Sequence, residues 1–87
     1  MDLSYDLYVR HEVYHILKAI SRRHREPIVA FVESLPSDPF QAGDFEEIDR
    51  DGRPCKVTIV GKYAVYFWTD HAAKEIRVLD LIDADQT

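Results

Sequence analysis

Apolar and polar side chains alternate along residues 3–9, which read LSYDLYV. A period of two residues is typical of a half-buried strand. From His11 onward the period becomes helical, and a second stretch with the same spacing begins at Ile28. The apolar positions of the two stretches are Val13, Ile16, Leu17 and Ile20, and then Ile28, Phe31, Val32 and Leu35. The pattern therefore predicts one strand followed by two amphipathic helices.

Pro27 limits where the second helix can begin. Because proline lacks an amide hydrogen and is best tolerated in a first turn, we expect this helix to start near His24 or Arg25. The two helices then form a short hairpin. Residues 36–44 read PSDPFQAGD, and their two prolines and glycine predict a surface loop that ends the helical region.

The rest of the chain has the pattern of four strands: FEEIDR, RPCKVTIV, YAVYFWT and EIRVLDLI. Asp51-Gly52 is a strong hairpin signal, Gly61-Lys62 predicts a second turn, and residues 70–73 predict a third. We therefore expect an α+β fold: an N-terminal strand, a two-helix hairpin, then a four-stranded antiparallel meander with the helices on one sheet face. We expect residues 1–87 to form a single domain.

The length of the turn at Gly61 decides which side chains share a sheet face, because a shift of one residue exchanges the two faces. A three-residue loop directs six apolar side chains toward the helices: Val57, Ile59, Val65, Phe67, Ile76 and Val78. A two-residue loop instead places Lys56 and Thr58 on the face of Val65. We prefer the three-residue loop. It leaves a mixed aromatic and polar face open: Lys56, Thr58, Ala64, Tyr66, Trp68, Glu75, Arg77 and Leu79.

The chain has 87 residues, of which 46% are hydrophobic and 31% charged, as in one small globular domain. No apolar run reaches the ~20 residues that span a bilayer, and the N-terminus is acidic where a signal peptide is basic, so we expect a cytoplasmic protein without membrane contact. Cys55 lies in an alternating apolar stretch and is read as a small core residue. Residues 28–52 carry seven acids and one base, and the net charge of −5 disfavours nonspecific nucleic-acid binding.

Residues 11–15 read HEVYH and match the H-E-x-x-H pattern of zinc metalloproteases. His11 and His15 would bind the ion, and Glu12 would activate a zinc-bound water. At about 100° per residue, however, the helix's apolar stripe lies nearly opposite the two histidines. No third ligand is evident, since His24 and His71 belong to distant connections. We therefore interpret the motif as a solvated helix face and predict neither a metal site nor a cofactor.

Three features together resemble the RelE/ParE superfamily, the toxins of bacterial type II toxin-antitoxin modules. They are the L-x-x-D-P-F exit at residues 35–40, the acidic strand before Asp51-Gly52, and the phrase GKYAVYF at residues 61–67. The resemblance covers nearly the whole chain. It implies two helices on an antiparallel sheet and a cognate antitoxin that wraps the toxin. It also implies one of two targets: messenger RNA in the ribosomal A site, which RelE-like members cut, or DNA gyrase, which ParE-like members inhibit.

The resemblance also implies site residues. RelE-like cleavage uses lysines on one strand, an arginine after the G-x-Y turn and a tail with basic, Tyr or His residues. Lys56 matches the first lysine, whereas Thr58 and Ala64 replace two other bases and the tail IDADQT supplies none. We assign Lys56 and Arg77 as candidate catalytic residues of a weak or degenerate endoribonuclease, and leave open whether the chain is an enzyme.

Four further residues are candidates for binding RNA or a partner protein: Arg50, Arg53, Tyr66 and Trp68. The aromatic rings could stack on bases, at about 1–3 kcal/mol per base. We favour a different interpretation, in which Tyr66 and Trp68 form cross-strand pairs, Arg77 lies over Tyr66, and antitoxin or a second copy covers the face. The basic segment 22–25 is interpreted as a solvated helix end with favourably placed cations.

The sequence thus supports a toxin that binds a cognate antitoxin and acts on the ribosome or on gyrase. The alternative is a noncatalytic binding module of the same fold that acts with a partner in transcriptional autoregulation. The oligomeric state, a homodimer included, is left open.

Overall fold

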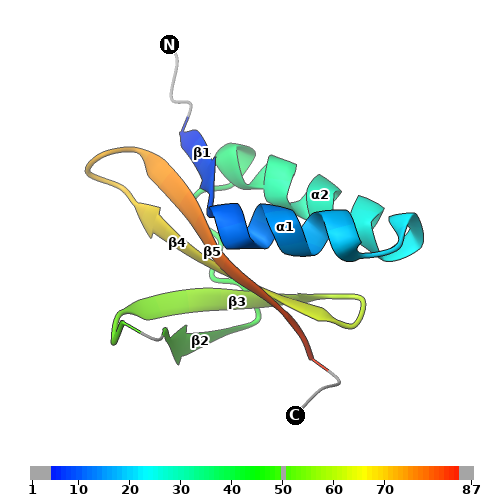
Figure 1. Ribbon diagram of the computed structural model, residues 1–87. Coiled ribbons are helices and arrows are strands. Elements are labelled where there is room, and N and C mark those ends of the chain that lie inside the picture. Colours follow the sequence, from blue (N-terminus) through cyan, green and yellow to red (C-terminus); the bar gives the residue numbers. More distant parts are fainter. Residues whose placement is uncertain (1–4, 50, 85–87) are drawn as a thin grey trace.

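The computed structural model describes residues 5–49 and 51–84, which form two helices and one five-stranded sheet (Figure 1). The elements are β1 (Asp6–Val9), α1 (His11–Ala19), α2 (Arg22–Ser34), a 3-10 turn η1 (Leu35–Ser37), β2 (Phe45–Ile48), β3 (Pro54–Val60), β4 (Tyr63–Asp70) and β5 (Glu75–Asp83). Both helices lie on the same side of the sheet. The predicted α+β fold is confirmed.

The sheet has the strand order β1-β5-β4-β3-β2. Strands β2 to β5 form the predicted antiparallel meander. The N-terminal strand β1 pairs in parallel with the last strand, with Asp6 opposite Glu75 and Val9 opposite Val78. The two helices carry the chain from β1, at one edge of the sheet, to β2 at the opposite edge, and β2 runs antiparallel to β1.

The core lies between the helices and the sheet. Its buried side chains are Val13, Leu17, Ile20, Ile28, Val32, Leu35, Val65, Phe67, Ile76, Val78 and Leu81. The rings of Phe31 on α2 and Phe67 on β4 meet edge to face, with centroids 5.8 Å apart. Val13 and Leu17 are the buried positions of α1, so this helix uses its predicted apolar stripe.

Helix α2 begins at Arg22, earlier than Pro27 led us to expect. The Ser21 carbonyl accepts the backbone N–H groups of His24 and Arg25, so a regular turn forms ahead of the proline. Proline at position 27 removes only the bond that its own amide would donate to the carbonyl of Arg23. Both residues are exposed, so water can satisfy that carbonyl.

The predicted three-residue loop at Gly61 is wrong. Val60 pairs directly with Tyr63, so the turn has two residues, and Gly61 adopts φ of +62°, which suits a tight hairpin. Thr58 therefore lies opposite Val65, and Lys56 opposite Phe67, on the helix side of the sheet. Val57 and Ile59 face the open side instead. The polar pair is accommodated because the loop before β2, and not a helix, covers it: Lys56 Nζ donates to the Gln41 carbonyl at 2.9 Å.

A β-bulge shapes the other half of the sheet. Tyr66 pairs with Asp80, but its neighbour Phe67 pairs with Val78, so Leu79 is the extra residue. The bulge keeps Val78 and Phe67 on the helix side, as predicted, together with Val65 and Ile76. The face of the sheet away from the helices, which we call the open face, carries the candidate site.

Candidate functional site

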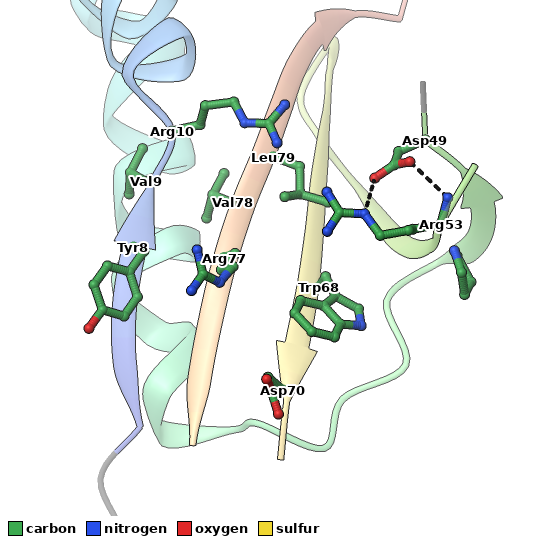
Figure 2. Close-up of a pocket in the computed structure, with 11 residues that line it drawn as sticks. Tyr8, Val9, Arg10, Asp49, Arg53, Trp68, Asp70, Arg77, Val78 and Leu79 are labelled. Atoms are coloured by element: carbon green, nitrogen blue, oxygen red, sulfur yellow. Dashed lines mark hydrogen bonds and ion pairs between the residues drawn. The ribbon is translucent and has the colours of Figure 1, made fainter. Parts of the chain in front are cut away.

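A groove crosses the open face between β1, β5, β4 and the β2–β3 hairpin, and has a volume of about 460 Å³ (Figure 2). We call it the open-face groove. Its lining residues are Tyr8, Val9, Arg10, Asp49, Arg53, Pro54, Trp68, Asp70, Arg77, Val78 and Leu79. Three of them are arginines and two are aspartates, on a chain whose net charge is −5.

Tyr8, Arg77 and Trp68 form a row across three adjacent strands. Tyr8 on β1 is opposite Arg77 on β5, which is opposite Trp68 on β4. The guanidinium carbon of Arg77 lies 5.3 Å from the centroid of the Tyr8 ring, within the range of a cation–π contact. Arg77 Nη2 also donates to Glu75 Oε1 at 2.8 Å. The expected position of Arg77 over Tyr66 is therefore wrong, because the parallel pairing with β1 brings Tyr8 beside it.

Arg10 and Arg53 bring two more guanidinium groups to the groove (Figure 2). The Arg10 backbone N–H donates to the Val78 carbonyl at 3.0 Å, which fixes the residue at the junction of β1 and α1. Arg53 Nε lies 3.7 Å from Asp49 Oδ2, and its Nη2 lies 3.4 Å from Asp51 Oδ2. Arg53 is thus partly neutralised, whereas none of the described residues forms an ion pair with Arg10.

Asp49 organises the hairpin turn that carries Arg53. Its Oδ1 accepts the backbone N–H groups of Arg53 and Asp51, each at 2.9 Å. The hydrogen bond from the Arg53 backbone, with smaller help from that of Asp51 and from nearby guanidinium charge, lowers the pKa of Asp49 below its usual value. Asp49 therefore stays ionised at neutral pH, where it can orient Arg53 but is poorly suited to donate a proton.

Tyr66 lies in an adjoining hollow of the open face, which shares Arg10, Asp49 and Leu79 with the groove. Burial, together with the negative charge of Glu47, raises the pKa of its phenol. The hydroxyl is therefore neutral at physiological pH and available as a hydrogen-bond donor.

The structure brings together four of the predicted site residues, because Arg53, Tyr66, Trp68 and Arg77 all lie on the open face. Lys56 does not line the groove: its amine bonds to the Gln41 carbonyl, and the residue lines a neighbouring hollow that shares Pro54 and Trp68 with the groove. Arg50 lies outside the described residues. Sequence reasoning missed Tyr8 and Arg10. Tyr8 was visible as a polar-side position of the alternating strand, but only the parallel pairing of β1 and β5 places it in the groove.

The HEVYH motif points to solvent, as predicted. His11, Glu12 and His15 are exposed, whereas Val13 and Leu17 are buried. His24 packs against Tyr63, and His71 accepts or donates a bond to the Tyr5 hydroxyl at 2.9 Å, so neither approaches the motif. Within the described part of the chain, no group of three or more His, Cys, Asp or Glu side chains converges on a common point.

Two smaller expectations concern the basic segment and Cys55. Arg22, Arg23 and Arg25 occupy the first turn of α2, where the helix dipole disfavours positive charge, so the expected favourable placement is wrong. The ion pair of Arg22 with Glu26, at 2.6 Å, offsets part of this cost.

Cys55 is buried, as predicted, and burial raises the pKa of its thiol. No helix within the described ranges has the length and apolar character needed to cross a membrane.

Comparison with known proteins identifies the fold. No protein-family model and no curated protein matches the chain. Among solved structures, the chain is similar to one in the archaeal RelE-RelB complex from Pyrococcus horikoshii OT3, with a TM-score of 0.78 and 16% identity over 97% of this chain and 99% of that one. It is also similar to a chain of the toxin-antitoxin complex RelBE2 from Mycobacterium tuberculosis, with a TM-score of 0.73 and 16% identity over 92% and 98% of the two chains.

A third similar structure is a mutant of the E. coli toxin RelE in the free state, with a TM-score of 0.72 and 11% identity over 97% of this chain and 87% of that one. The chain therefore has the fold of the RelE toxins, which confirms at the level of fold the resemblance read from its motifs.

Proposed function

We propose that the chain is the toxin component of a type II toxin-antitoxin module, and that it acts and is neutralised through its open face. Two of the similar structures are toxin-antitoxin complexes, and their likeness extends over almost the whole of this chain. The shared fold supports the proposal, while function itself depends on the site.

The observation that carries the proposal is the chemistry of the open-face groove. Arg10, Arg53 and Arg77 surround the aromatic side chains of Tyr8 and Trp68 on a chain that is otherwise acidic. Guanidinium groups bind phosphate or carboxylate oxygens in a planar, bidentate manner, and indole or phenol rings stack on flat groups. The groove is thus suited to an anionic partner with planar groups, either single-stranded RNA or an acidic, aromatic segment of the antitoxin.

Binding is better supported than cleavage. The resemblance implies several bases around the scissile phosphate, yet Lys56 faces the other side of the sheet, and Thr58 and Ala64 occupy the positions of two further bases. Asp49, a titratable group of the groove, is held ionised by backbone hydrogen bonds. We therefore infer that any endoribonuclease activity is weak and relies on Arg77, with Arg53 and Arg10 stabilising phosphate charge.

The second candidate is a noncatalytic module of the same fold that binds a partner protein in transcriptional autoregulation. The bond of the Lys56 amine to the Gln41 carbonyl favours it, because the residue that best matches the family's catalytic set does not line the groove. Inhibition of gyrase is a third candidate function, because it requires binding to gyrase and no catalytic residues.

Induced expression of the whole chain in E. coli, alone and with the product of any small neighbouring reading frame, tests these proposals. Translation is followed by labelled methionine incorporation, and gyrase by plasmid supercoiling. Translation arrest relieved by Arg77→Ala or Trp68→Ala, but not by Lys62→Ala, is expected of a ribosome-directed toxin. Lys62 is a matched control because it pairs with Asp83 away from the groove. Loss of supercoiling would support gyrase inhibition, and harmless accumulation would overturn the toxin proposal in favour of the binding module.

A further inference from the structure

The proposed function leaves one feature of α1 unused, the paired imidazoles of His11 and His15. The two residues are four apart, so they lie on successive turns of the same exposed face. Their Nε2 atoms are 2.8 Å apart, and the ring centroids are 4.3 Å apart. Two nitrogens at this distance share one proton between them, because a close contact of two bare lone pairs would be repulsive.

We propose that His11 and His15 form a surface chelate for a divalent transition-metal ion, with Cu(II) or Ni(II) as the preferred ions. The metal replaces the hydrogen bond: the donor ring carries its proton on Nδ1 instead of Nε2, and each exposed neutral ring turns its Nε2 lone pair toward the ion. Imidazole nitrogen is a good ligand for both ions, and copper stands highest in the stability order of the divalent first-row metals.

The separation of the two nitrogens is short enough for both to bind one metal ion. With metal–nitrogen bonds of about 2.0–2.1 Å, nitrogens at the observed separation subtend an angle of about 85–90° at the metal. This is the angle between neighbouring ligands in square-planar or octahedral coordination, which Cu(II) and Ni(II) adopt.

The surroundings leave room for the ion. Within α1, the amine of Lys18 lies over the ring of Tyr14, 5.3 Å from its centroid, and Arg10, which precedes His11, lines the groove. Glu12 is exposed beside the pair and adds a negative charge that favours a bound cation. Since no third His, Cys, Asp or Glu converges here within the described residues, water completes the coordination. Helix α1 covers the sheet face opposite the open face (Figure 1), and neither histidine lines the groove.

Titration of the whole chain with Cu(II) tests the chelate, by calorimetry for affinity and by electron paramagnetic resonance for the ligands. We expect a site that binds Cu(II) at least tenfold more tightly than Zn(II), with a spectrum of two coordinated imidazole nitrogens. His15→Ala and His11→Ala should each weaken binding at least tenfold and leave one imidazole in the spectrum. His24→Ala is the matched control and should change neither quantity, because His24 lies on α2.

The double variant should bind Cu(II) with an affinity within twofold of that of either single variant. The reason is that removal of one ligand already destroys the chelate. Equal Cu(II) affinity in wild type and His15→Ala would overturn the proposal. So would a wild-type spectrum with a single imidazole, or a loss of affinity in His24→Ala as large as that in His15→Ala. Far-ultraviolet circular dichroism of each apo variant establishes that α1 is still folded.

Discussion

Arg77 on the last strand places its guanidinium 5.3 Å from the ring centroid of Tyr8 on the first strand. The contact links the two strands on the face where the groove lies, so Tyr8 holds a positive charge of the groove in place. A double-mutant cycle with Tyr8→Ala and Arg77→Ala should give a coupling of about 0.5–1 kcal/mol in the free energy of unfolding, as measured by urea denaturation.

Tyr8→Phe removes the hydroxyl and keeps the ring. This variant should retain most of the coupling with Arg77, because the guanidinium contacts the face of the ring. The exposed pair of Lys18 and Tyr14 has the same separation, 5.3 Å, and serves as a reference outside the groove. A coupling indistinguishable from zero, or one lost equally in Tyr8→Phe, would contradict the cation–π interpretation.

Asp49 should make stability depend on pH. Its pKa in the folded chain is lowered, chiefly by the Arg53 backbone N–H, so its contribution is fully present above the unfolded value of about 3.9 and is lost as pH falls through the folded value. Asp49→Asn keeps an oxygen that accepts the two backbone bonds but loses the charge. We expect the variant to be less stable than wild type at pH 7 by chemical unfolding, and the difference to shrink below pH 4.

Asp51→Asn supplies the comparison, since the Asp51 carboxylate is exposed and has one long contact with Arg53 at 3.4 Å. It should change stability little at either pH. A stability gap between Asp49→Asn and wild type that stayed constant down to pH 2.5 would show that the charge of Asp49 is not what matters.

Thr58 carries a hydroxyl that is buried without a hydrogen-bond partner among the described residues. A buried polar group that makes no bond costs about 1–3 kcal/mol, and valine has nearly the same shape without that cost. Thr58→Val should therefore stabilise the fold by about 1 kcal/mol and raise the midpoint of thermal unfolding. Thr69→Val, at a half-buried position on the next strand, should give a smaller change.

Gly43 lies where the loop passes over β3, with φ of +70°. A methyl group there would approach the Val57 carbonyl oxygen to 2.9 Å and Thr58 Oγ1 to 3.2 Å. Gly61 has a similar φ of +62° but open space around it. Both Gly→Ala changes incur the left-handed backbone cost of about 1–2 kcal/mol, so Gly43→Ala should destabilise the chain by clearly more than Gly61→Ala in urea unfolding. Equal losses would mean that the loop moves away at no cost.

The sequence predicted the elements well because their periods are local. Val13 and Leu17 follow the helical spacing, and the residues of β3 to β5 alternate, so each element could be recognised from its own residues. The register could not be read in the same way, because Lys56 and Thr58 face a loop and not the helices. The assumption that only apolar residues face the helix side of the sheet therefore leads to the wrong turn length at Gly61.

The groove was only half predictable for a related reason. Trp68 and Arg77 are neighbours across an antiparallel pair that the hairpin signals already implied. Tyr8 and Arg10 reach the same place only through the parallel pairing of β1 with β5, which depends on the crossover of two helices and has no local signal in the sequence. Pairing between strands that are far apart in the sequence cannot be predicted from the local spacing of apolar residues.

The parallel pairing of β1 with β5 also has a consequence for how the protein is made. Asp6 meets Glu75, so the first strand has no strand neighbour until nearly the whole chain has been synthesised. The loss of chain entropy on closing the loop between β1 and β5 comes before the stabilising contacts of the two strands form. Folding is therefore slowed. A nascent chain on the ribosome therefore has no open-face groove. The groove is completed only when the last strand has paired with the first.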